Sequence, residues 1–189
     1  YVSADNVTIS RFTIRKGGGY WGDGIDVCGD FVTITGNYIS GNGVDGIDLY
    51  YSSNNNIITG NYISGNGEDG IYLCYSSNNN ITGNYIWGNG EDGIYLGCSS
   101  NNNITGNNIS GNNWYGIILV SSSNNSIIGN YISGNNWYGI YLDYSSNNNI
   151  TSNTFQDDSI VIWGGDLSHW NTHTIENNIA NGRPIYYYK

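Results

Sequence analysis

The segment "NNITGNYIWGNGEDGIYLGCSSN" at 79–101 decides the fold, because it recurs with small changes along most of the chain. Its Gly-Asn step falls at Gly36, Gly60, Gly83, Gly106 and Gly129, at intervals of 23 or 24 residues. Self-similarity at a fixed period of this length is the sequence signature of a solenoid. The repeat therefore predicts that one coil of backbone is laid down about every 23 residues.

Within the segment, the aliphatic residues alternate with polar residues or tyrosine, which is the period of a β-strand. Ile81, Ile86, Ile94 and Leu96 point one way and leave Tyr95 pointing the other way. Three short strands per coil, separated by Asn/Gly corners, close a triangular turn, and equivalent residues then stack about 4.8 Å apart. We therefore expect Ile94 and Leu96 to be buried and Tyr95 to be exposed.

These patterns predict an all-β chain that forms a single-stranded, right-handed parallel β-helix of roughly seven to eight coils. Residues 1–155 carry the parallel β-helix repeats, and residues 156–189 read as a less regular, C-terminal continuation of the same β-helix. A single coil buries too little apolar surface to offset the entropy of ordering its residues, so stacking is obligatory.

Asparagines recur at two corners of each coil. One set is Asn42, Asn66, Asn89, Asn112 and Asn135, and the other is Asn37, Asn61, Asn84, Asn107 and Asn130. We expect these residues to adopt the left-handed backbone conformation and to hydrogen-bond as amide ladders. This structural role accounts for them without any ligand.

The composition excludes two classes of partner. The net charge is −10, and the five basic residues lie near the two ends, at Arg11, Arg15, Lys16, Arg183 and Lys189. The body of the chain cannot neutralise a phosphate backbone, so nucleic-acid binding is not expected. The sequence also lacks an apolar run long enough to span a bilayer.

A column of acidic residues lies just before each Gly-Ile step, with two more on the adjoining strand. It comprises Asp23, Asp45, Asp69 and Asp92, and the outward pair is Asp26 and Asp48. Stacked carboxylates repel, so they should take up protons or bind a cation, for which calcium is the natural candidate. The alternatives are a solvated acidic edge whose carboxylates cap turns, and carboxylate catalysis at spacings of about 4.8 or 9.6 Å.

Two features argue against catalysis, although the sequence leaves the question open. Coil length varies by only one or two residues, so no long loop walls a cleft. The body of the chain also has no lysine or arginine to act as a base. If the chain is an enzyme, a polysaccharide hydrolase or lyase is the expectation.

Aromatic residues replace the acidic pairs further along the same corner. The candidates for contact with a carbohydrate are Trp114, Tyr115, Trp137 and Tyr138, with Tyr85 and Tyr95 on neighbouring outward columns. Such rings suit sugar faces, and they equally suit protein contacts. A third reading is that tyrosine is simply a good strand former.

Six N-x-S/T sequons are candidate glycosylation sites, at Asn6, Asn80, Asn103, Asn108, Asn124 and Asn149. Cys28 and Cys74 share a column two coils apart, beyond disulfide reach, and Cys98 is expected on the face opposite to Cys74. His169 and His173 flank Trp170, and without a third ligand they are interpreted as loop histidines rather than as a metal site.

The pattern "NxITGNxIxxNxxxGIxL" over residues 5–155 resembles the parallel β-helix repeats of the NosD-like and carbohydrate-binding/sugar-hydrolase group. The ending "WNTHTIENNIANGRPIYYYK" at 170–189 is similar to the C-terminal ends of such arrays in archaeal surface proteins. The resemblance implies a β-helix in a cell-surface or extracellular setting. It transfers no catalytic site, because the repeat motif is structural.

The sequence thus favours a non-catalytic extracellular or cell-surface β-helix that serves as a structural or assembly module. Unpaired end strands would let copies stack head to tail into filaments, so the expected partners are the chain itself or neighbouring surface proteins. The alternative is a carbohydrate-binding or polysaccharide-cleaving module that uses the acidic and aromatic edge. No cofactor is expected beyond possible calcium.

Overall fold

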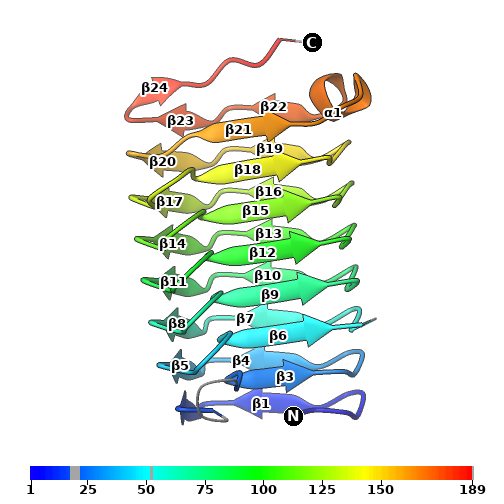
Figure 1. The fold of residues 1–189 in the computed structure, drawn as a ribbon, viewed down its shortest axis with the longest axis vertical. Coiled ribbons are helices and arrows are strands. Elements are labelled where there is room, and N and C mark those ends of the chain that lie inside the picture. The colour runs from blue at the N-terminus through cyan, green and yellow to red at the C-terminus, as the bar shows by residue number, and fades with distance from the viewer. Residues whose placement is uncertain (18–21, 52, 189) are drawn as a thin grey trace.

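The computed structural model describes residues 1–17, 22–51 and 53–188 as a stack of coils in a right-handed parallel β-solenoid (Figure 1). Each of about 7 turns contributes one short strand to each of three sheets, and about 23 residues make one turn. The predicted fold class is confirmed. Among the described residues, no helix is both long enough and apolar enough to cross a bilayer.

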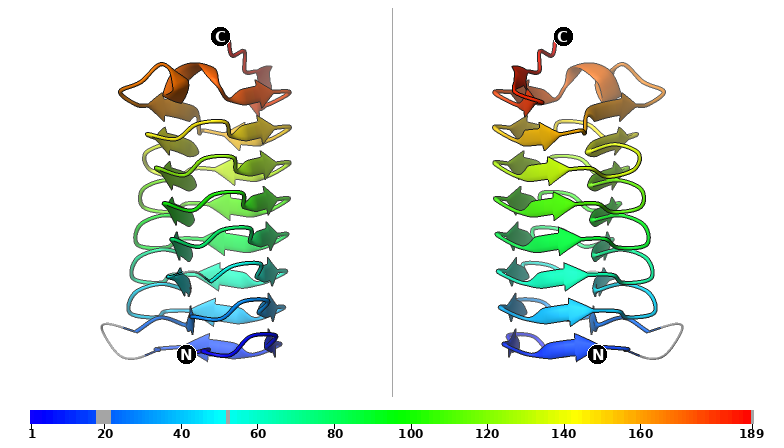
Figure 2. Two further views of the ribbon diagram at one scale, coloured as in Figure 1. Left: turned by 90° about the vertical axis from the view of Figure 1, so that its right-hand side faces the viewer. Right: turned by 90° about the vertical axis from the view of Figure 1, so that its left-hand side faces the viewer.

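The three sheets run along the solenoid axis as its three faces (Figure 2). Sheet A contains β3 (Ile25–Val27), β6 (Ile47–Tyr50), β9 (Ile71–Cys74), β12 (Ile94–Gly97), β15 (Ile117–Val120), β18 (Ile140–Asp143) and β21 (Ile160–Trp163). Sheet B contains β1 (Thr8–Ser10), β4 (Thr33–Thr35), β7 (Ile57–Thr59), β10 (Asn80–Thr82), β13 (Asn103–Thr105), β16 (Ser126–Ile128), β19 (Asn149–Thr151) and β22 (Thr174–Glu176). Sheet C contains β2 (Thr13–Arg15), β5 (Tyr38–Ser40), β8 (Tyr62–Ser64), β11 (Tyr85–Trp87), β14 (Asn108–Ser110), β17 (Tyr131–Ser133), β20 (Thr154–Gln156), β23 (Ile179–Ala180) and β24 (Arg183–Pro184).

The strand register follows the repeat, and every coil pairs in parallel with the coils before and after it. Ile94 lies between Ile71 and Ile117 in sheet A, and neither Ile94 nor Leu96 is accessible to solvent. Tyr95 points outward and is half-buried. The predicted register is therefore confirmed, and with it the assignment of interior and exterior faces.

The Gly-Ile step that marks each repeat has a steric cause. A Cβ atom on Gly70 would lie 2.5 Å from Cγ2 of Ile86 and 2.6 Å from the carbonyl oxygen of Gly93. Real Cβ atoms do not approach neighbours so closely, since interiors are packed to crystal density. Glycine is thus required where the chain enters sheet A.

The predicted asparagine ladders form. Asn84 is inaccessible to solvent, and its Nδ2 donates to the carbonyl oxygen of Ile58 at 2.9 Å and to Oδ1 of Asn107 at 3.0 Å. Its own Oδ1 accepts the backbone N–H of Asn61 at 3.0 Å. Each amide therefore satisfies two buried backbone groups of the preceding coil and bonds to the asparagine side chain of the next coil. Without these partners the buried groups would cost free energy.

The predicted left-handed conformation of these asparagines is wrong. Positive φ angles occur instead at the preceding glycines, such as Gly36 and Gly41, because glycine bears no Cβ and adopts this conformation without strain. A third buried ladder was missed, although its asparagines recur at the same period. It comprises Asn56, Asn79, Asn102, Asn125 and Asn148.

The C-terminal segment lies over the last coil (Figure 1). After the short helix α1 (Ser168–Asn171), strand β24 turns back antiparallel to β23. The backbone N–H of Ile185 donates to the carbonyl oxygen of Asn178 at 2.9 Å, and Ile185 and Tyr187 pack partly buried against the core. The Tyr187 hydroxyl donates to the Trp170 carbonyl oxygen. Head-to-tail stacking on this end would have to displace the segment.

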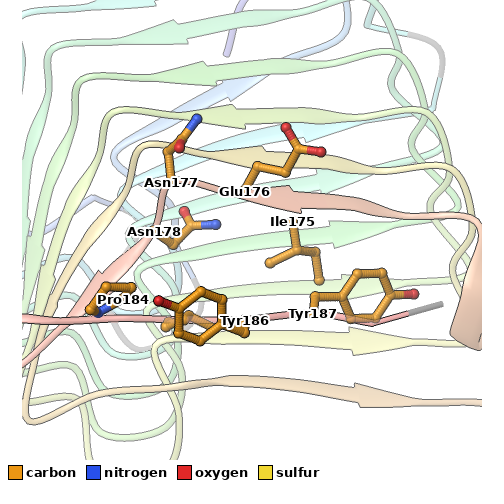
Figure 3. A pocket seen from close by; sticks show the side chains of 8 residues that line it. Ile175, Glu176, Asn177, Asn178, Pro184, Tyr186 and Tyr187 are labelled. Atoms are coloured by element: carbon orange, nitrogen blue, oxygen red, sulfur yellow. The ribbon is translucent and has the colours of Figure 1, made fainter.

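This segment encloses a space of about 430 Å³ with the last strand of sheet B. Figure 3 shows Ile175 pointing toward Tyr186 and Tyr187, whereas Glu176 and Asn177 point away from them. Apart from tyrosine, Glu176 is the one ionisable residue in its lining. The space therefore forms because the C-terminal segment covers the core, and its lining does not bring together a set of reactive or ligand-binding side chains.

We expect the Asn84→Ala variant to unfold at a much lower denaturant concentration than the wild type. Removing the amide takes this side-chain partner from the Asn61 N–H and the Ile58 carbonyl, at about 1–3 kcal/mol for each buried group, while Oδ1 of Asn107 keeps the Asn84 backbone N–H. The matched control is Asn103→Ala, an exposed asparagine of the next coil, which should change stability by no more than about 0.5 kcal/mol. Equal costs for the two variants in urea titrations would show that the ladder does not stabilise the fold.

Candidate functional site

The corner between sheets C and A holds the acidic column in the first half of the solenoid. Asp45, Asp69 and Asp92 are all buried there. Oδ1 of Asp45 accepts the backbone N–H of Asp69 at 2.7 Å, and Oδ1 of Asp69 accepts that of Asp92 at 2.8 Å. The carboxyl groups therefore join successive coils in the same way as the asparagine ladders, which favours the turn-capping alternative.

Burial changes the ionisation of this column. Burial raises the pKa of Asp45 to about 8 and that of Asp92 to about 7. For Asp69, burial and then the neighbouring carboxyls of Asp92 and Asp45 hold the pKa well above its ordinary value. At neutral pH these raised pKa values keep Asp45 and Asp69 largely protonated, so the column carries less stacked charge than three ionised aspartates would.

Asp48, on the outward side of sheet A, extends the acidic region. Burial, followed by the charges of Asp23 and Asp26, raises its pKa to about 7, and its Oδ1 is buried without a hydrogen-bond partner. Nevertheless, the described residues contain no group of three or more His, Cys, Asp or Glu side chains that could hold a metal ion. Calcium binding by these aspartates therefore stays a prediction.

The same corner becomes aromatic in the second half of the solenoid. The Trp114 and Trp137 rings stack with centroids 5.8 Å apart and planes at 22°, and their exposed fractions are 37% and 58%. Tyr138 is also exposed. Tyr115, by contrast, is only 8% exposed, because it packs edge-on against Trp137 and face-on against Tyr141 at 5.1 Å. Tyr115 supports this surface from beneath and offers no face to a ligand.

The other predicted aromatic contacts lie elsewhere. Tyr95 stacks on Tyr72 at 4.9 Å on sheet A, and Tyr85 stacks on Tyr62 at 5.0 Å on sheet C. The structure thus unites Trp114, Trp137 and Tyr138 but places Tyr85 and Tyr95 on two different faces. Tyr141, which completes the cluster, is placed by the repeat on the outward column of Tyr72 and Tyr95, but its stacking on Tyr115 was not predicted.

A second group of polar and aromatic residues forms near helix α1, where the repeat had ended. The His169 ring lies edge-on to Tyr144 with centroids 5.5 Å apart, and its charge opposes the pKa rise that burial produces at Asp143. His173 is fully buried, with Nδ1 accepting the Asn148 N–H at 3.2 Å and Nε2 3.0 Å from the His169 carbonyl oxygen. Neither contact could be found from sequence period.

The prediction for Cys98 is wrong. Cys74 lies on the outer side of β9, and Cys98 is exposed beyond the end of β12 with φ of 48°. Both thiols therefore face outward, because strand alternation stops at the left-handed corner residue. Among the sequons, Asn6, Asn103 and Asn124 are exposed, and Asn80, Asn108 and Asn149 are partly covered.

Comparison with known proteins identifies the class. The family described as periplasmic copper-binding protein (NosD) matches residues 22–186, so the chain belongs to the NosD family. No curated protein sequence matches the chain.

Several solved structures share the fold. The periplasmic alginate epimerase AlgG superposes with a TM-score of 0.74 and 18% identity, covering 93% of this chain and 43% of AlgG. The A-module of the Azotobacter vinelandii mannuronan C-5 epimerase AlgE4 gives 0.73 and 19%, covering 96% and 62%. Pectate lyase Pel9A gives 0.66 and 11%, covering 98% and 67%. The chain thus spans less than two thirds of the two epimerases, and identities this low show the fold alone.

The donor set does not fit a copper site. Copper is held by imidazole, thiolate and thioether ligands, and this chain has two histidines, three cysteines and no methionine. Both ring nitrogens of His173 already have backbone partners. The described residues bring no three of these donors together.

The raised aspartate pKa values predict that the protein loses stability as pH rises. Their folded pKa values lie above the unfolded value of about 4, so this stabilisation is complete below that pH. It should be lost progressively as pH rises from about 4 to about 7–8, and the loss should be complete above that range, where Asp92 and Asp45 are ionised in the folded protein as well. Thermal melts across this range should show the decline.

The Asp69→Asn variant should flatten that decline and melt higher than the wild type at pH 8 but not at pH 4. An asparagine Oδ1 can still accept the Asp92 N–H, while the charge is gone. The control is Glu68→Gln, which removes a charge from the exposed neighbouring position and should have a smaller effect. Identical pH profiles for wild type and Asp69→Asn would contradict this account.

Proposed function

We propose that this chain is a non-catalytic β-helical module that binds neutral polysaccharide outside the cytoplasm. The observation that carries the proposal is the exposed, stacked pair Trp114 and Trp137 at the corner between sheets C and A. Solvent-exposed indole pairs are uncommon on monomeric surfaces and mark binding sites. Tyr115 packs edge-on against Trp137 and is itself stacked on Tyr141, which limits the entropy lost on binding.

Polar groups beside the indoles suit sugar hydroxyls. Asn113 and Asn136 precede the two tryptophans, and Nδ2 of Asn136 donates to Oδ1 of Asn113 at 2.9 Å in an exposed ladder. Each exposed amide keeps further donor and acceptor capacity for a ligand. An apolar ring face flanked by amides matches the alternation of C–H faces and hydroxyls on a sugar ring.

Charge supports a neutral ligand over an acidic one. The related structures are named as alginate epimerases and a pectate lyase, whose polymers carry carboxylates. Between Lys16 and Arg183 this chain has neither lysine nor arginine to pair with them. An acidic solenoid would repel such polymers at long range.

The accessible chemistry supports binding without cleavage. Of the stacked carboxyls, Asp45, Asp69 and Asp92 are buried and cap backbone groups. A general acid or base must lie within reach of the substrate. A carbohydrate-cleaving role is therefore the less favoured proposal, and release of reducing or unsaturated ends from a polysaccharide would establish it.

The description of the family and the name of the alginate epimerase AlgG both specify the periplasm. We extend this to an extracellular or periplasmic location for this chain, where it would meet polysaccharide. We also propose that the exterior is glycosylated, and the exposed sequons are the observation that supports it. Neighbouring surface proteins are the other partners expected there.

Head-to-tail assembly into a filament is the second proposal, and it requires the C-terminal segment that covers the last coil to move aside. Strands β1 and β2 lie at sheet edges, each with a partner on one side only among the described residues. Such edges accept another strand. Light scattering of the purified chain should then show concentration-dependent growth, and a monodisperse monomer would exclude the filament.

The double variant Trp114→Gln/Trp137→Gln should bind neutral polysaccharide at least about tenfold more weakly, since interface tryptophans typically contribute about 2 kcal/mol. Glutamine is the neutral counterpart of Glu68 and Glu91, which occupy this column in earlier coils, so the fold should persist. Affinity electrophoresis in gels containing glucomannan or hydroxyethylcellulose measures the change. Trp163→Gln, at another exposed tryptophan, is the matched control. Unchanged retardation of the double variant would exclude the corner as the binding site.

A further inference from the structure

The outward face of sheet C, at the left edge of Figure 1, is uncharged from β5 to β20. Its two outward columns are Tyr38, Tyr62, Tyr85, Asn108, Tyr131 and Thr154, and Ser40, Ser64, Trp87, Ser110, Ser133 and Gln156. One column thus presents mainly phenol rings, and the other presents mainly hydroxyl groups.

Trp87 interrupts the hydroxyl column. Serine occupies the position in the two coils before it and the two coils after it. The Trp87 side chain is 38% exposed, and it belongs to none of the ring pairs found among the described residues. The neighbouring Tyr38, Tyr62 and Tyr85 rings cover one another, with centroids 5.2 and 5.0 Å apart. Trp87 therefore offers a ring face that no other aromatic residue covers.

Two shallow depressions meet at this tryptophan. One, of about 300 Å³, is lined by the tyrosine stack with Trp87, Asn108 and Ser110. The other, of about 390 Å³, is lined by Trp87, Ser110, Tyr131, Ser133, Gln156 and neighbouring glycines. Because both include Trp87 and Ser110, they form one trough parallel to the solenoid axis. From β5 to β20 it extends over five coil steps, roughly 24 Å at about 4.8 Å each.

We propose that this trough is a second polysaccharide-binding site, which takes a neutral chain lying along the solenoid axis with one sugar ring stacked on Trp87. The ligand class rests on the proposed function, but the site is a different one. The glycine column Gly88, Gly111 and Gly134 lies between the outward face of sheet C and the corner that holds Trp114. The serine hydroxyls and the Asn108 and Gln156 amides supply donors and acceptors along the chain.

The charges around the trough select the same kind of ligand. Arg15 precedes the hydroxyl column and Asp157 follows Gln156, so the single charges lie at the two ends. A polyuronate would find no cation along the trough itself, whereas a neutral glycan needs none. A long, open and uncharged surface fits an extended polymer better than it fits a compact small molecule, which requires an enclosing pocket.

The test uses the purified chain and affinity electrophoresis in gels containing glucomannan or hydroxyethylcellulose, with alginate as the acidic comparison. Trp87→Ser restores the residue found in four other coils, so its unfolding midpoint should be no lower than that of the wild type. We expect it to weaken retardation by about tenfold or more, while Trp87→Phe retains most of the binding. The corner double variant should keep residual binding that adding Trp87→Ser abolishes.

The outcomes separate the two proposals. If Trp87→Ser is retarded like the wild type while the corner variant is not retarded, the trough is overturned and the corner stands. If only Trp87→Ser loses binding, the trough stands and the corner fails. A wild-type chain that no neutral gel retards, or that alginate retards more strongly, overturns both. If light scattering shows a wild-type dimer that Trp87→Ser dissociates, the face is covered by a second copy and the trough proposal is wrong.

Discussion

Every coil of this protein depends on the hydrogen bonds that it makes with the next coil. The interior strands pair only between coils, and the Asn84 side chain shows how the corners follow the same rule, bonding to Ile58 and Asn107 in the coils on either side. A buried backbone group without a hydrogen-bond partner lowers the free energy of unfolding by as much as several favourable contacts raise it. The fold is therefore stable as a stack, and a single coil has no stable fold of its own.

This dependence divides the sequence into constrained and free positions. The interior isoleucines, the ladder asparagines and the glycines at the start of each sheet A strand must recur. Each of them contacts the equivalent residue of the neighbouring coil. Outward positions contact solvent and vary, so a corner can pass from Glu91 to Trp114 without a change in backbone pairing. Residues that differ from the repeat are therefore the candidates for function in such a protein. Trp87 is one of them, because serine occupies its position in the neighbouring coils.

The same division explains what could be predicted from the sequence. Period and alternation were sufficient to place Ile94 and Leu96 in the core and Tyr95 outside it, and they placed Trp114 one coil from Trp137. They could not show that Tyr115 is buried, because that depends on how neighbouring rings pack across the corner. Nor could they place His169 against Tyr144, since helix α1 lies outside the repeat. The conformation of the corners was also misjudged, because glycine competed with asparagine for the left-handed position.

The constant rise between coils has a consequence for any polymer that lies along the solenoid. Contact groups on one face recur at a fixed interval of about 4.8 Å, which backbone pairing sets and side chains cannot alter. A polymer whose own repeat is a simple multiple of this interval stays in phase and meets equivalent groups at each unit. A polymer with another repeat drifts out of phase after a few units, and its added length then contributes no further affinity. Ligand choice by such a surface is therefore a matter of commensurate periods as well as of local chemistry, and a longer array discriminates more sharply than a short one.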